Sequence, residues 1–167
     1  MARTAKQTFL ATYDREHATT MRVLRAYPTD KLDLRPQPAM KSARELAWVF
    51  VIERGLGMKV WNDELAQGVP VGSPPAVPDD WNALLAALEG AHAEFRTVID
   101  AAPESMLSEK VHFLIAPKTM GEISRLTWLW FLLHDEIHHR GQFSIYLRMA
   151  GGKVPSIYGP TADEPWM

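Results

Sequence analysis

Cysteine is absent from this chain of 167 residues, and its absence removes several kinds of chemistry at once. Without thiols there are no disulfides, no thiolate nucleophiles and no cysteine-ligated zinc sites. Any metal site must therefore use nitrogen and oxygen ligands. The lack of cysteine also agrees with a cytoplasmic location, which we expect for this protein.

Long apolar runs and basic clusters are also lacking. No apolar run reaches the roughly 18 residues of a membrane span, and the N-terminal MARTAKQTF has no apolar core of a secretory signal. We therefore expect neither a membrane partner nor secretion. The formal net charge of −2 argues against a nucleic-acid partner. The chain is 47% hydrophobic and 23% charged, which is typical of one ordinary globular domain spanning residues 1–167.

Four long segments have the apolar periodicity of amphipathic helices, and proline-rich joints separate them. The helices are expected at residues 5–27, 42–61, 79–102 and 119–150. Two capping boxes mark helix starts, S-A-R-E at Ser42 and T-M-G-E at Thr119. An acidic residue, Asp79 or Asp80, suits the start of the third helix.

The remaining segments complete the predicted fold. The stretch GVPVGSPPAVP, residues 68–78, contains four prolines and two glycines and is expected to be a linker. The stretch KVHFLIAP, residues 110–117, has strand-like composition but is short and solitary, so we expect an extended loop. The tail after residue 152 is expected to lie over the helices. Four helices without convincing strands predict an all-α fold, a four-helix bundle with a long crossover between helices two and three.

The stretch HDEIHHRGQ, residues 134–142, holds three of the six histidines. His134 and His138 are four residues apart, so on a helix they project side by side, as two imidazoles must to share one ion. His139 points about 100° away from His138 and is expected elsewhere. Alternatively, His134 and His138 are polar residues whose hydrogen bonds are satisfied within a bundle, or they are boundary residues. The neighbouring stripe is expected to be core, which places the pair at the edge of the buried face: Leu126, Leu129, Leu133 and Ile137.

Two further pairs on this helix have acid four residues before base. They are Asp135 with His139 and Glu136 with Arg140. This order is the favourable one on a solvated helix face, where we expect both pairs to lie.

Two stretches resemble one known family. HDEIHHRGQFSIYLRMAGGKVPSIYGPT is similar to the C-terminal signature of the DinB/YfiT-like proteins, which are bacterial four-helix bundles, and LDLRPQPAMKSARELAW resembles their segment leading into helix two. Together the two matches cover 45 of the 167 residues. The resemblance implies a three-histidine metal site, with two ligands falling on His134 and His138. It also implies a small-molecule substrate such as a low-molecular-weight thiol, transferase, isomerase or hydrolase chemistry, and a homodimer.

The chain departs from the family pattern where the third histidine is expected. ELAW is followed by Val49, which cannot bind a metal. One turn later stands Glu53, whose carboxylate would complete a His₂Glu site or act as a general base. Zinc or nickel is the expected ion, and manganese or iron would also suit these ligands. The open alternative is a degenerate site in a non-catalytic binding or interaction module.

Other residues are weaker candidates. His17 is a reserve ligand or a boundary residue, His92 is expected to be a satisfied core histidine, and His112 has no partner in the pattern. Gln142 lies one turn beyond His138, where its amide would hydrogen-bond a ligand histidine. Three tryptophans are expected in the core: Trp48, Trp128 and Trp130. Alternatively, aromatic side chains beside a metal cavity would shape an apolar substrate pocket.

Overall fold

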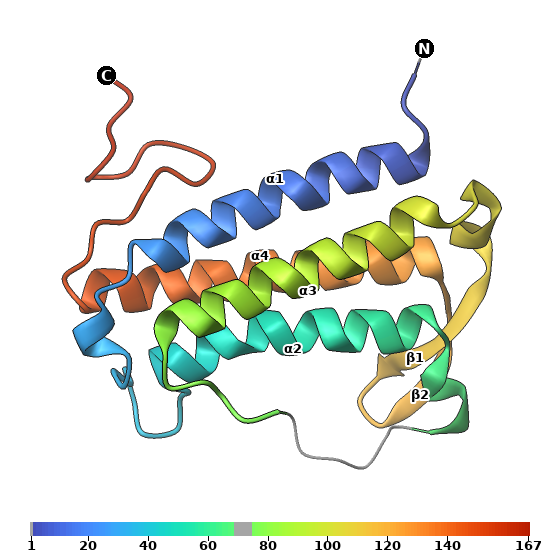
Figure 1. The fold of residues 1–167 in the computed structure, drawn as a ribbon, viewed down its shortest axis with the longest axis horizontal. Coiled ribbons are helices and arrows are strands. Elements are labelled where there is room, and N and C mark those ends of the chain that lie inside the picture. The colour runs from blue at the N-terminus through green and yellow to red at the C-terminus, as the bar shows by residue number, and fades with distance from the viewer. Residues whose placement is uncertain (1, 69–74) are drawn as a thin grey trace.

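Four long helices pack as a bundle beside a small hairpin (Figure 1). The computed structural model describes residues 2–68 and 75–167. The helices are α1 (Ala5–Arg25), α2 (Ala43–Trp61), α3 (Trp81–Ala101) and α4 (Arg125–Met149). They confirm the four predicted helical segments. Within the described residues, none of these helices has the length and apolar character needed to span a bilayer.

Side chains cap the start of every long helix, which explains where each one begins. The predicted capping box is confirmed on α2, where Ser42 accepts from the backbone N–H of Glu45 and the Glu45 carboxylate accepts from that of Ser42. Thr4 and Gln7 form the same motif on α1. Asp80 caps α3 by accepting two backbone N–H bonds.

The direction of the helices explains the crossover. In Figure 1, α2 and α3 both begin on the left, whereas α1 and α4 run from right to left. The connection from α2 to α3 must therefore return along the whole bundle, as predicted. It begins with a short 3₁₀ segment, Glu64–Gln67. Of the predicted linker, residues 69–74 lie outside the described residues, and residues 68 and 75–78 have no regular structure.

A hairpin replaces the predicted loop and the predicted first turn of the last helix. Strands β1 (Lys110–Ala116) and β2 (Thr119–Ser124) pair antiparallel, so the extended-loop prediction and the helix start at Thr119 are both wrong. Lys118 has φ of 60° in the turn. A Cβ on Gly121 would lie 2.5 Å from Ile115 Cδ1, the end of an exposed side chain that would have to move. Ser124 is the cap that starts α4.

The buried core divides into two apolar clusters along the bundle. One cluster includes Phe50 and Phe143, and the other includes Phe95 and Trp128. A set of buried polar side chains lies between them. This set, here called the polar layer, consists of Glu16, Thr20, Glu53, Arg54, His92, Glu136 and Arg140.

The C-terminal tail follows α4 as an irregular segment and is tied to the bundle, as expected. Val154 N–H donates to the Asp163 carboxylate, which also pairs with Arg148 of α4 at 2.5 Å. The Tyr158 hydroxyl reaches inward and lies 2.6 Å from Arg140 Nη2 and 2.7 Å from Glu16 Oε2. The tail therefore closes over one polar pair of the layer.

Candidate metal centre

The three predicted ligands do not meet in the structure. Glu53 on α2 is buried, with 5% of its surface exposed. His134 and His138 on α4 are exposed. His138 Nε2 lies 2.8 Å from the Gln142 amide nitrogen, which is the histidine contact predicted for Gln142, and His134 lies beside Trp130. The structure therefore does not place the histidine pair with Glu53.

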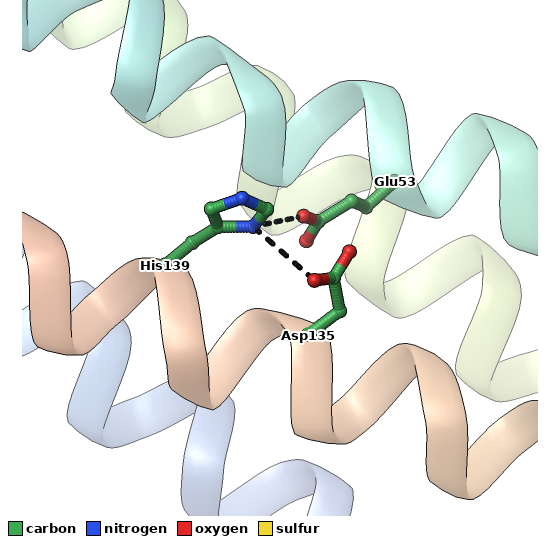
Figure 2. Close-up of side chains that lie close together, drawn as sticks. All are labelled: Glu53, Asp135 and His139. Atoms are coloured by element: carbon green, nitrogen blue, oxygen red, sulfur yellow. Dashed lines mark hydrogen bonds and ion pairs between the residues drawn. The ribbon is translucent and has the colours of Figure 1, made fainter. Parts of the chain in front are cut away.

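A different set of donors surrounds Glu53, and Figure 2 shows the three side chains pointing toward one another. One ligand atom each from Glu53, Asp135 and His139 lies within 4.8 Å of the others. His139 Nδ1 is 2.6 Å from Glu53 Oε1 and 3.9 Å from Asp135 Oδ1. One residue comes from α2 and two from successive turns of α4. These three residues are the candidate metal centre.

The rotation of α4 explains the difference of one residue between His138 and His139. Glu136 and Arg140 were expected on a solvated face, but they are 0% and 1% exposed. The buried face of α4 is therefore centred closer to these two residues than the Leu126–Ile137 stripe indicates. This rotation, most of one 100° residue step, brings Asp135 and His139 to the edge facing α2. It turns His134 and His138 to the solvent.

Glu53 and His139 form a tightly coupled pair. Burial raises the pKa of the Glu53 carboxyl above its usual value, while His139 and Arg54 act in the opposite direction. The hydrogen bond to Glu53 raises the pKa of the His139 imidazole, against its partial burial. The two groups therefore retain a shared proton over a wider pH range than either would alone.

The donor atoms fit a divalent cation. Glu53 Oε2 is buried and has no hydrogen-bond partner among the described residues; Arg54 Nη1 is 3.8 Å away. A buried carboxylate oxygen without a donor is costly, and a cation relieves that cost. The Asp135 side chain is 39% exposed, so the group opens to solvent. One imidazole and two carboxylates suit zinc, manganese or iron.

The other candidate histidines lie outside this group. His92 is buried, as predicted, but it is satisfied only in part: its Nε2 lies 3.2 Å from Asp14, whereas its Nδ1 has no hydrogen-bond partner among the described residues. His17 is half-buried, and its ring stacks on His92 rather than joining Glu53. His112 was expected to have no partner, but its Nδ1 lies 3.1 Å from Asp63 Oδ1. The sequence gives no signal for that contact, because Asp63 follows α2 and His112 lies in β1.

Comparison with known proteins gives one family. The model of the DinB family matches residues 1–166. The uncharacterized protein YrdA of Bacillus subtilis (strain 168) is 26% identical over 157 residues, covering 93% of this chain and 89% of YrdA. A DinB-like protein of Bacillus cereus ATCC 10987 superimposes with a TM-score of 0.71 at 18% identity, covering 90% of this chain and 95% of that one. The DinB-like protein YjoA of Bacillus subtilis superimposes with a TM-score of 0.70 at 15% identity, covering 90% of this chain and 97% of YjoA. At these identities the two structures show the shared fold alone.

Proposed function

The chain belongs to the DinB family, and from this premise we propose that it is a divalent-metal-dependent enzyme whose ion is held by Glu53, Asp135 and His139. The observation that carries the proposal is the convergence of three donor atoms within 4.8 Å on a buried carboxylate. Three protein ligands leave open positions for a substrate, as in catalytic rather than structural sites.

The chemistry follows from the donors. When bound, a divalent ion supplies Lewis acidity, which lowers the pKa of a water or thiol that approaches it. Glu53 would serve as a ligand of the ion or, in place of that role, as the general base that accepts the proton so released. His139 Nδ1 lies 2.6 Å from Glu53 Oε1 and would exchange this hydrogen bond for the ion when one binds. Transfer of a low-molecular-weight thiol to an electrophile, or a related isomerisation or hydrolysis, fits these roles.

One observation favours a second candidate, a non-catalytic binding module. Glu53 and His139 already satisfy each other at 2.6 Å, and Asp135 lies one helical turn from His139. These contacts are also those of a structural ion pair that fixes α2 against α4. In this reading the centre holds no ion and the DinB fold serves binding alone.

Metal content separates the two candidates. The protein is purified without chelators or a polyhistidine tag, offered zinc, nickel and manganese separately, and analysed by mass spectrometry. We expect close to one ion per chain, lost in His139→Ala and in Glu53→Gln. The matched control, His138→Ala, alters an exposed neighbour on the same helix and should retain the ion.

Three outcomes would contradict the proposal in different ways. If the wild-type protein binds no ion, the non-catalytic binding module remains as the candidate function. An ion lost in His138→Ala and kept in His139→Ala assigns the metal to the sequence-predicted pair. An ion that survives Glu53→Gln with unchanged affinity removes Glu53 from the ligand set.

A further inference from the structure

Every helix interrupts its buried apolar row at the level where the two core clusters meet. On α1, Glu16 and Thr20 lie between Tyr13 of one cluster and Met21 of the other. The same order holds on the other helices: Phe50, Glu53, Arg54 and Val60 on α2; Leu88, His92 and Phe95 on α3; Leu133, Glu136, Arg140 and Phe143 on α4. The polar layer therefore crosses the whole bundle.

The part of the layer that involves α4 is well satisfied. Glu136 accepts from Thr20 Oγ1 at 2.7 Å and from Arg54 Nη2 at 2.6 Å. Arg140 donates to the Glu16 carboxylate at 2.7 Å. Within each of these two ion pairs, the positive and negative charges neutralise each other inside the bundle. Buried charges are expected to be paired in this way.

The part between α1, α2 and α3 is not satisfied. Four buried polar atoms there have no hydrogen-bond partner among the residues that the structure describes: Tyr13 Oη, His17 Nδ1, Arg54 Nε and His92 Nδ1. Tyr13, Arg54 and His92 are 1%, 2% and 8% exposed. Such groups are rare in native proteins, and each one left dry costs about as much as a lost hydrogen bond. Four together would consume a large share of the stability of a domain of this size.

The four side chains lie against one another. The His17 and His92 rings stack with centroids 3.7 Å apart and planes within 7°. The Tyr13 ring centroid is 4.3 Å from that of His92. The Arg54 guanidinium carbon is 5.5 Å from the Tyr13 ring centroid. Four orphaned atoms from three helices therefore share one region of the layer.

The orphaned atoms require a neutral molecule with both donor and acceptor capacity. Arg54 Nε–H can only donate, and its charge is already matched by Glu136. With His92 Nε2–H donating to Asp14, His92 Nδ1 is an acceptor. The Tyr13 hydroxyl can do both. A cation would face Arg54, and an anion would add to Glu136 and Asp14. Water has the required chemistry, because it both donates and accepts hydrogen bonds.

We propose that the region between Tyr13, His17, Arg54 and His92 is an internal hydration site that binds neutral molecules of the size and chemistry of water. A cavity of about 310 Å³ opens between α2 and α3 and reaches Arg54, which is the member of the site that lines it. The proposal requires no ion at the candidate metal centre, although Arg54 Nη1 lies 3.8 Å from Glu53 Oε2.

The first test removes one hydroxyl and keeps the ring. In an occupied site Tyr13→Phe loses a bond to water, so the unfolding equilibrium constant in urea should rise roughly fivefold or more. In a dry site the same change relieves an orphaned group, so the constant should fall. The matched control is Tyr27→Phe, whose hydroxyl is also on a buried ring and donates to the Lys31 carbonyl at 3.0 Å. If Tyr13→Phe raises the unfolding equilibrium constant about as much as the control does, the result supports the site. An unchanged or lower unfolding constant overturns it.

The second test observes the occupant directly. In the Tyr13→Phe protein no exchangeable hydroxyl remains on that ring, so a nuclear Overhauser effect between the Arg54 Nε–H proton and the water resonance reports bound water. We expect this cross-peak in both wild-type and variant proteins, with the sign of a long-lived contact. Its absence from both proteins would overturn the proposal even if the stability change had the expected sign.

Discussion

Replacing Glu136 by leucine should be among the most damaging single changes to this protein, because this carboxylate joins three helices. Its two oxygens accept from Thr20 on α1 and from Arg54 on α2. The Glu136 and Arg54 side chains are each 1% exposed. Glu136→Leu therefore leaves a guanidinium inside the bundle, with Glu53 Oε2 at 3.8 Å as its remaining carboxylate contact among the described residues.

The magnitude follows from the burial of the pair. Removing one partner of a buried ion pair costs about 3–5 kcal/mol, since the other charge stays behind unpaired. The Thr20 hydroxyl also loses its acceptor, which adds about 1 kcal/mol. We expect a total loss of roughly 4–6 kcal/mol, against a typical domain stability of about 5–15 kcal/mol. Arg54→Met together with Glu136→Leu removes both charges, so the double variant should be more stable than Glu136→Leu alone.

Urea unfolding followed by tryptophan fluorescence measures the wild type, Glu136→Leu, Arg54→Met, the double variant and the control Thr20→Val. That control removes the hydroxyl and retains the ion pair, so it should cost about 1 kcal/mol. A Glu136→Leu loss below about 1 kcal/mol would refute the reasoning, because that is the scale of an exposed pair. If the stability lost in the double variant equals the sum of the losses in the two single variants, the reasoning is also refuted. A coupled pair must give a double-variant loss smaller than that sum.

Two further predictions concern pH and assembly. Burial lowers the pKa of His17 to about 3, and the positive charges of His92, Arg54 and Arg25 act in the same direction. The neutral imidazole therefore contributes fully to stability above its unfolded pKa near 6.5, and this contribution is lost as the pH falls from 6.5 toward 3. His17→Gln should flatten the decline of the urea midpoint between pH 7 and pH 4, and an unchanged slope would contradict the burial. The family resemblance implies a homodimer, and we propose that its interface includes Ile145, which is 60% exposed on α4. Ile145→Asp should then give a monomer by light scattering, whereas a monomeric wild-type protein would reject the dimer itself.

Local signals predicted the helices well, because the chemistry that starts a helix is written in adjacent residues. Ser42 with Glu45, and Asp80 before α3, are local signals of this kind. The same logic failed at Thr119, where the pattern T-M-G-E also fits a capping box. There the residues of T-M-G-E pair with another strand, and Gly121 lies opposite Phe113. A pattern read within one segment does not contain that contact, so the hairpin was missed.

The structure places His139, rather than the predicted ligand His138, beside Glu53 for a related reason. Apolar periodicity orients a helix correctly when the buried face is apolar, but the centre of α4 buries Glu136 and Arg140. Each of these charges is acceptable inside the bundle only because a partner on another helix matches it, Arg54 on α2 and Glu16 on α1. Read alone, an acid and a base four residues apart predict a solvated face. If Glu136 and Arg140 are instead paired with charges on α2 and α1, they predict a buried face of α4. That orientation by itself turns His139 rather than His138 toward α2. Pairing buried charges between helices therefore has to come before orienting each helix by its apolar residues.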